Sequence, residues 1–268
     1  MIGESMRLRI ASAVVLAPVA LAAVYAGGWS TVALVAVAGV LAANEWDRLS
    51  GGTGLPGTTA IIQASMVLFT SILAGLEFYE AAIGTTIIGA AVIAIYAVLR
   101  DGTPIWSAMG VLYLAIPMIA LIWMRRDDAG IVVLIWLLLI VWATDIAGIL
   151  AGKAIGGPKL WPRISPNKTW SGAVAGVVAA AIVGAITAGL REKATLGIMI
   201  PLSIGLSVIS QFGDLAESAV KRYYGVKDTG NLIPGHGGIL DRIDGLLLVL
   251  PAAAAIALLN KGSVLIWP

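Results

Sequence analysis

The sequence predicts an all-α protein, a polytopic membrane helix bundle with about nine transmembrane helices and no soluble domain. Of its 268 residues, 59% are hydrophobic and only 12% are charged, whereas a soluble domain carries about 25% charged residues. The apolar residues gather in long runs, and a helix needs about 20 of them to cross a bilayer. None of the runs alternates between apolar and polar residues, which is the pattern of a membrane β-strand. We therefore expect an integral membrane protein.

Nine runs are candidates for transmembrane helices. The first follows Arg7 and Arg9, and we interpret it as a helix rather than a signal peptide because many similar runs follow it. Only a tight turn, Gly27–Ser30, separates it from the second. The longest hydrophilic stretch, about 30 residues, is too short for a core of its own. The runs lie near residues 9–27, 30–46, 59–78, 81–99, 104–124, 129–151, 171–190, 195–212 and 243–260.

The basic residues predict the orientation of the chain, because Lys and Arg are enriched in cytoplasmic loops. With the N-terminus inside, twelve of the 17 Lys and Arg residues lie on the cytoplasmic side and five on the other. The two most charged connections, 152–170 and 213–242, then share the cytoplasmic side. We expect a protein of the inner or plasma membrane whose functional loops face the cytoplasm.

The first polar constellation follows the eighth apolar run. If that helix continues, Asp214, Glu217, Ser218 and Lys221 stand at i, i+3, i+4 and i+7, and therefore line one face. Lipid penalises such a face, so we expect it to point into the bundle or into a watery cavity. A helix end anchored by ordinary interfacial charges is the plainer alternative.

The second constellation is Pro234–Gly238 with Asp241, Arg242 and Asp244. It lies in the segment 218–244, which holds four basic residues, three aspartates and the single histidine of the chain. Glycines on both sides of His236 let backbone amides approach an anion closely. His236 either acts directly or only satisfies backbone groups of the loop. We expect Asp214 and Asp241 to meet from different helices as oxygen ligands of Mg²⁺, with Asp244 next in line. Whether a second, monovalent cation joins Mg²⁺ stays open. Four basic residues can neutralise phosphate oxygens there: Lys221, Arg222, Lys227 and Arg242.

The segment resembles the signature of the phosphatidate cytidylyltransferase family, also called CDP-diacylglycerol synthases. The match is long and has no gap. A second block, residues 164–172, resembles the Ser-Pro-x-Lys-Thr-x-Glu-Gly stretch of the same family, although Ser171 replaces the usual Glu. Any role of that Glu is therefore not transferred. The matching residues of the first block are Ser218, Val220, Lys221, Arg222, Lys227, Asp228, Gly230, Ile233, Pro234, His236, Gly237, Gly238, Asp241, Arg242 and Asp244.

The resemblance implies an enzyme that joins CTP to phosphatidic acid and releases CDP-diacylglycerol and pyrophosphate. It implies Mg²⁺ as cofactor, membrane lipids as surroundings and no nucleic-acid partner, and it leaves a homodimer open. Residues 1–128 form the N-terminal membrane helices, and residues 129–268 carry the catalytic site. The expected catalytic residues are Asp214, Asp241, Asp244, Lys227 and His236, of which the first three bind metal. The expected substrate-binding residues are Lys221, Arg222, Asp228, Arg242, Lys168, Ser165 and Asp145.

Two other functions compete with this interpretation. A membrane transporter would use intramembrane carboxylates such as Asp145 and Asp214 to couple ions, although the chain has no internal repeat that supports a transporter built from inverted halves. A CDP-alcohol phosphotransferase would carry an Asp-Gly-x-x-Ala-Arg block, of which only Asp244-Gly245 is present. Two glycine pairs, Gly148 with Gly152 and Gly172 with Gly176, are expected to mark helix packing.

Overall fold

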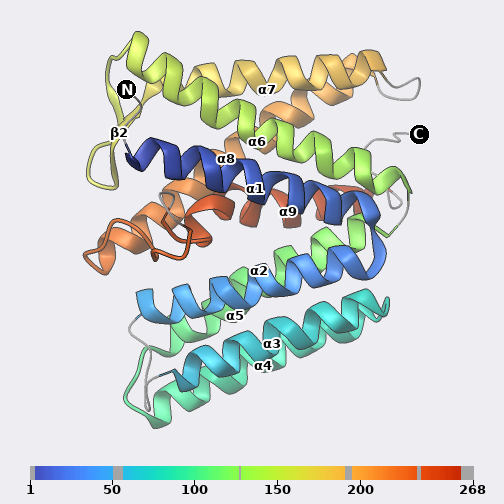
Figure 1. Ribbon diagram of the computed structural model, residues 1–268, viewed down its shortest axis with the longest axis vertical. Helices are drawn as coiled ribbons and strands as arrows, with labels where there is room; N and C mark the ends of the chain where they lie inside the picture. Colours follow the sequence, from blue (N-terminus) through green and yellow to red (C-terminus); the bar gives the residue numbers. More distant parts are fainter. Residues whose placement is uncertain (1–3, 51–56, 127, 191–194, 234–236, 261–268) are drawn as a thin grey trace. The chain divides into compact units, whose positions relative to one another are not determined.

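The computed structural model describes residues 4–50, 57–126, 128–190, 195–233 and 237–260. This part of the chain holds nine α-helices and one two-stranded hairpin (Figure 1). The predicted membrane bundle of about nine helices is therefore confirmed. The elements are α1 (Glu4–Ala26), α2 (Gly28–Leu49), α3 (Thr58–Gly75), α4 (Tyr79–Leu99), α5 (Pro104–Met124), α6 (Asp128–Ala154), β1 (Lys159–Trp161), β2 (Ser165–Thr169), α7 (Trp170–Leu190), α8 (Leu196–Tyr223) and α9 (Leu240–Leu259).

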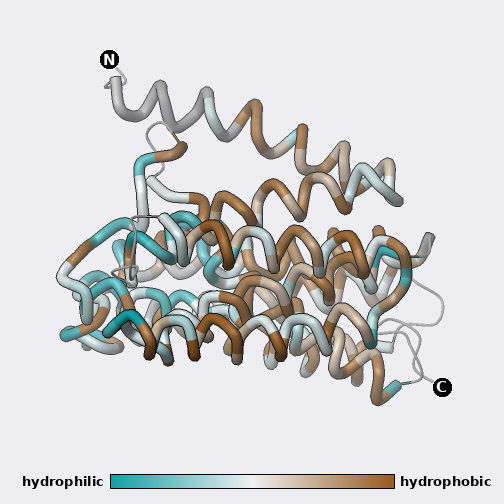
Figure 2. Tube along the Cα trace, turned by 90° about the horizontal axis from the view of Figure 1, so that it is seen from below, coloured by the Kyte–Doolittle hydropathy of each residue, from teal (hydrophilic) through white to brown (hydrophobic). Residues whose placement is uncertain are grey.

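Eight of the helices, α2 to α9, are long and apolar enough to cross a membrane, and α1 adds a shorter apolar stretch, Val14–Ala26. Figure 2 shows apolar positions along the middle of the helices and hydrophilic positions at helix ends and connections. Many large apolar side chains are exposed along these helices, including Ile88 and Ile95 on α4. Such exposure suits contact with lipid, and the protein is an integral membrane protein.

The chain forms two compact units. The first unit comprises Met1–Ile131 and Tyr223–Ile243, and the second comprises Val132–Arg222 and the chain from Asp244 onward. Helices α8 and α9 each run from one unit into the other. The division into units describes packing and does not test where the catalytic site lies. The assignment of the site to residues 129–268 therefore stays a prediction.

Close helix contacts hold the first unit together. Helix α2 packs against α3 and α5, and α4 packs against α3 and α5 (Figure 1). Glycines allow these contacts: a β-carbon at Gly39 of α2 would lie 2.5 Å from Val67 of α3, and one at Gly110 of α5 would lie 2.5 Å from Trp46 of α2. Because apolar burial drives membrane helices together only weakly, such close packing supplies much of their attraction.

The second unit uses the glycine pairs that the sequence analysis assigned to packing. A β-carbon at Gly172 of α7 would lie 2.6 Å from the carbonyl oxygen of Gly148 in α6, and one at Gly176 would lie 3.0 Å from Thr144. Thr144 also hydrogen-bonds Ser207 of α8 across 2.8 Å. The packing role of these glycines is confirmed.

Two features go beyond the apolar runs of the sequence. The connection 152–170 contains the antiparallel hairpin β1–β2, which pairs Lys159 with Thr169 and Trp161 with Ser165. Helix α8 continues beyond the apolar run 195–212 and ends at Tyr223. Hydropathy detects only the apolar part of α8, whereas an intrahelical ion pair between Glu217 and Lys221 stabilises its polar continuation.

Candidate active site

The polar continuation of α8 carries the first constellation as predicted. Ser218 Oγ donates to Asp214 Oδ1 across 3.3 Å, one helical turn apart. Lys221 Nζ pairs with Glu217 Oε1 at 3.2 Å, and the Glu217 side chain is only 1% exposed. A buried acid and its lysine on a membrane helix are expensive to keep, which favours a functional role for this face.

The hairpin brings a second cation to the same face. Lys168, on β2, forms a short ion pair with Asp214 Oδ2, and both side chains are partly exposed, at 25% and 31%. Thr169 follows Lys168 and caps α7, because its Oγ1 accepts the backbone N–H of Gly172 at 3.1 Å. Ser171 Oγ donates to the carbonyl oxygen of Gly156 at 2.5 Å and so ties the start of α7 to the end of α6. The cap and this tie hold Lys168 in place.

Helices α8 and α9 cross closely beside Asp214. A β-carbon at Gly213 would lie 2.7 Å from the carbonyl oxygen of Asp244, and one at Gly245 would lie 2.5 Å from Ser210 Oγ. Each glycine of the crossing is followed or preceded by an aspartate. The crossing therefore places Asp214 and Asp244 near one another.

Asp244 is the centre of a charged cluster in the second unit. Its electrostatic neighbours are Asp214, Asp145 and Lys221. Its Oδ1 accepts the backbone N–H of Gly245 at 2.7 Å. Of the predicted site residues, the structure thus brings together three acids from three helices and the lysines Lys168 and Lys221.

The loop before α9 belongs to the first unit, and four amides in the loop and at the start of α9 are bound to carboxylates of the protein. Asp241 Oδ2 accepts from Thr229 N at 3.0 Å, Thr229 Oγ1 at 3.1 Å and Gly238 N at 2.9 Å. Glu45 of α2 accepts from the amides of Ile239 and Leu240, both at 2.9 Å. The glycine-rich loop was expected to offer amides to an external anion. In the structure, internal anions hold the amides of residues 238–240.

The remaining predicted residues are distributed over both units. Ser165 is half-buried on β2 of the second unit. His236 lies outside the described residues. The pairing of Asp214 with Asp241 joins residues of different units and stays a prediction. Four of these predicted residues have exposed side chains: Arg222 in the second unit, and Lys227, Asp228 and Arg242 in the first.

An aromatic cluster anchors the other end of the loop within the first unit. Trp106 of α5 packs against Tyr223 at a tilt and meets Tyr224 edge-on, with ring centroids 5.7 Å apart in both pairs. Trp46 of α2 lies 6.3 Å from Trp106 and donates its Nε1 hydrogen to the Trp106 carbonyl oxygen at 2.9 Å. Burial raises the pKa of the Tyr224 phenol, so this side chain stays neutral near pH 7.

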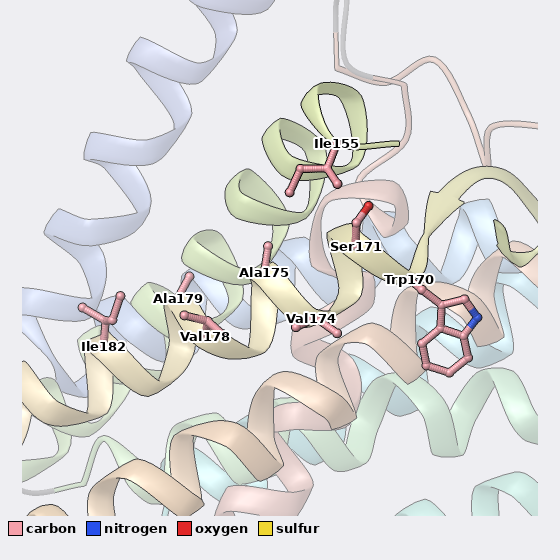
Figure 3. Close-up of a pocket in the computed structure, with 8 residues that line it drawn as sticks. All are labelled: Ile155, Trp170, Ser171, Val174, Ala175, Val178, Ala179 and Ile182. Carbon is pink, nitrogen blue, oxygen red and sulfur yellow. The ribbon is translucent and has the colours of Figure 1, made fainter. Parts of the chain in front are cut away.

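A hollow of about 610 Å³ runs along α7 (Figure 3). Figure 3 shows Val174, Val178 and Ile182 along α7, with Ile155 beyond the end of α6. Ser171 supplies a hydroxyl to this hollow at the start of α7, close to Lys168 in the sequence. Such an apolar surface on a transmembrane helix suits contact with acyl chains.

Comparison with known proteins decides the family. The family model described as "Cytidylyltransferase family" matches residues 7–259. Phosphatidate cytidylyltransferases of Brucella suis and Brucella melitensis are each 39% identical over 94% of this chain and 92% of their own length. The phosphatidate cytidylyltransferase of Bacillus subtilis is 44% identical over 47% of each chain. This protein belongs to the cytidylyltransferase family.

Membership of the cytidylyltransferase family identifies the protein as an enzyme and confirms the resemblance drawn from the two sequence blocks. It also extends that resemblance to the N-terminal helices, which the sequence blocks did not cover. The alternative of a transporter gains no support from any of these relatives.

Three residues that hold the loop of this cytidylyltransferase were missed from the sequence. Glu45 and Trp46 lie near the end of an apolar helix, and Thr229 stands between matched signature positions. An acid near the end of a transmembrane helix is a signal in its own right. The signal at Glu45 was outweighed by the denser cluster of charges at 218–244.

The donor chemistry of the cluster suits Mg²⁺, because carboxylate oxygens are its preferred protein ligands. Within the described ranges, no group of three or more His, Cys, Asp or Glu side chains is arranged to hold a metal ion. Lys168 contacts one oxygen of Asp214, where a cation would compete with it. Metal binding by Asp214, Asp241 and Asp244 stays a prediction.

Proposed function

We propose that this protein transfers a cytidylyl group from CTP to phosphatidic acid and forms CDP-diacylglycerol and pyrophosphate. One observation carries the proposal: Asp145, Asp214 and Asp244 gather with Lys168 and Lys221 in a membrane enzyme of the cytidylyltransferase family. The relatives named phosphatidate cytidylyltransferase support the choice of phosphatidic acid as acceptor.

The chemistry asks for charge stabilisation more than for a strong base. A phosphate oxygen of phosphatidic acid attacks the α-phosphorus of CTP, and the bond from that phosphorus to the bridging oxygen of the β-phosphate breaks. Pyrophosphate leaves with the electron pair. The attacking phosphate is already an anion near neutral pH, so positioning and neutralisation of the two anions lower the barrier.

The charged side chains take separate roles in this reaction. Lys168 and Lys221 reduce the repulsion between the two phosphates, and the exposed Arg222, Lys227 and Arg242 contact phosphate oxygens. Asp228 meets the nucleotide or orients Lys227. Asp214, Asp241 and Asp244 would hold Mg²⁺, which, when bound, supplies positive charge to the transferred phosphoryl group.

The location follows from the basic residues of the chain. We place the protein in the inner or plasma membrane with its charged loops at the cytoplasmic surface, where CTP is available. Phosphatidic acid reaches the site from the surrounding bilayer, and its acyl chains stay among the helices.

The test is an assay of the purified protein in detergent micelles with phosphatidic acid, CTP labelled at the α-phosphate, and Mg²⁺. We expect label to enter a lipid product and pyrophosphate to appear in equal amount. Chelation of divalent cations should stop the reaction, and added Mg²⁺ should restore it. Unchanged CTP in the presence of phosphatidic acid and Mg²⁺ would refute the proposed function.

A further inference from the structure

We propose that Glu45 is a positioning residue of this enzyme. From α2 it fixes Thr229 and the first turn of α9, and it thereby sets the place of Asp241. The inference rests on the proposed function and deepens it, because it gives an N-terminal helix a defined part in the reaction. Glu45 lies far outside the two blocks, 164–172 and 218–244, that carry the signature residues.

The contacts of Glu45 use both of its carboxylate oxygens. Oε1 accepts the amide of Ile239 at 2.9 Å, and Oε2 accepts the amide of Leu240 at 2.9 Å and the hydroxyl of Thr229 at 3.1 Å. The residue is only 4% exposed. Amides at the start of a helix have no partner within that helix and carry partial positive charge. A distant carboxylate therefore caps α9.

Thr229 links Glu45 to Asp241. Its hydroxyl lies 3.1 Å from Glu45 Oε2 and 3.1 Å from Asp241 Oδ2, while its backbone N–H donates to the same Asp241 oxygen at 3.0 Å. A hydroxyl has a single hydrogen, which the two carboxylates share. Movement of Glu45 is thus transmitted to Asp241 through one side chain.

The carboxylate of Glu45 also explains two glycines of the signature. A β-carbon at Gly238 would lie 2.1 Å from Thr229 Oγ1 and 2.5 Å from Glu45 Oε2. A β-carbon at Gly230 would lie 3.0 Å from Glu45 Oε1. The loop closes tightly around this carboxylate, and glycine is what permits the approach.

The neighbour of Glu45 supports the same loop from its other end. Trp46 packs against Trp106, and Trp106 packs against Tyr223 and Tyr224 where the loop begins. Two consecutive residues of α2 thus hold the loop near its beginning and at its end.

The carboxylate of Glu45 caps α9, but stability alone is a weak reason to bury its charge. A buried charge is weak evidence for stability, because desolvation offsets much of what its contacts gain. Glu45 holds the segment in which charged residues and the single histidine are concentrated. We therefore infer that its charge is kept for positioning.

The experiment compares four variants of the full-length protein. Glu45→Gln keeps the shape, but an amide has only one acceptor oxygen, so one of the two α9 amides must face an NH₂ group. Thr229→Val removes the shared hydroxyl, and Thr229→Ser restores it. The matched control is Asp47→Asn, because Asp47 is a buried acid of the same helix whose carboxylate accepts a hydrogen bond from Thr59 of α3.

We expect Glu45→Gln to lower kcat about 100-fold, as misplacement of reacting groups does, while KM for CTP stays within about twofold because both carboxylate oxygens of Glu45 are already occupied by Thr229 and the two amides. Thr229→Val should also lower kcat. The loss of kcat in the double variant should be smaller than the product of the two single losses. Thr229→Ser and Asp47→Asn should keep wild-type kcat after correction for folded protein.

Hydrogen exchange supplies a readout that does not need activity. In Glu45→Gln the amides of Ile239 and Leu240 should exchange at least about tenfold faster than in wild type, and in Asp47→Asn they should not change. Wild-type exchange and wild-type kcat in Glu45→Gln would overturn the inference, as would equal losses in Glu45→Gln and Asp47→Asn. An inactive wild-type protein would instead refute the proposed function, while exchange would still test the contact itself.

Discussion

Lys168 shows how a side chain from the hairpin completes a site on a helix. It neutralises Asp214 Oδ2, while Ser218 binds Oδ1 of the same carboxylate. Both side chains remain partly exposed, so a charged substrate or cation can reach them. The Lys168–Asp214 pair can therefore bind an anion and rearrange when the anion arrives.

Replacement of Lys168 tests this role. We expect Lys168→Met to lower kcat/KM for cytidylyl transfer about 100-fold, since a lost donor to developing charge typically costs that much. Lys168→Arg should keep part of the rate because the charge remains. The control is Lys159→Met, on the neighbouring strand, which should leave the rate nearly unchanged. Equal rates in Lys168→Met and wild type would contradict a role in binding phosphate.

At the level of single residues, the sequence predicted those side chains whose spacing is local. The face of Asp214, Ser218 and Lys221 follows from helical periodicity alone. Glu45 could not be connected with Thr229 and Leu240 in this way, because 184 and 195 residues of chain separate them. Only the fold brings such partners together.

The crossing of α8 and α9 is the structural device that sets the spacing of two aspartates. It depends on Gly213 and Gly245, whose missing side chains allow backbone and hydroxyl atoms to approach. The neighbouring positions Asp214 and Asp244 are consequently fixed by helix packing rather than by a flexible loop. Sites carried on packed helices are held more accurately than sites on loops.

A single methyl group should disturb this crossing. Gly213→Ala places a β-carbon 2.7 Å from the Asp244 carbonyl oxygen, and such overpacking costs about 1–3 kcal/mol of stability. The helices must separate, so the cytidylyl-transfer rate should fall at least about tenfold in protein that remains folded.

The matched control is Gly205→Ala on the same helix, where a β-carbon meets no atom within 4 Å. Its thermal stability and rate should equal those of wild type. If Gly213→Ala behaves like this control in both measurements, the crossing does not set the geometry of the site.

The helices themselves were largely predictable, because a transmembrane helix is recognised from the length of its apolar run. The hairpin β1–β2 was not, since its strands are short and rest on local pairing with a bulge between Lys159 and Trp161. The apolar run near 195–212 did not by itself show where α8 ends, because Asp214 and an ion pair replace apolar residues beyond it. Hydropathy carries no information about such polar helical turns.

The organisation of the whole chain assigns different tasks to its parts. The first unit joins α1–α5 to the loop before α9, and the second unit carries the cluster around Asp244. Family membership over residues 7–259 agrees with a role for the N-terminal helices as well. Both units therefore contribute residues of the signature.

The orientation of the chain can be tested by cysteine labelling. The natural sequence contains no cysteine, so a single introduced thiol gives an unambiguous signal. Lys159→Cys, in the exposed hairpin, should react with a membrane-impermeant maleimide only from the cytoplasmic side. Arg126→Cys, in the connection after α5, should react only from the opposite side. The reverse pattern would contradict the proposed orientation.

The most direct test of the central claim is the rate of CTP-dependent CDP-diacylglycerol formation by Asp214→Asn, measured at equal amounts of folded protein. Asn keeps the shape and removes the charge, and we expect a loss of at least about 100-fold. Asp101→Asn, the same change at an exposed residue beyond α4, should be silent. A near-normal rate in Asp214→Asn would show that the acid cluster at the α8–α9 crossing is not where the chemistry occurs.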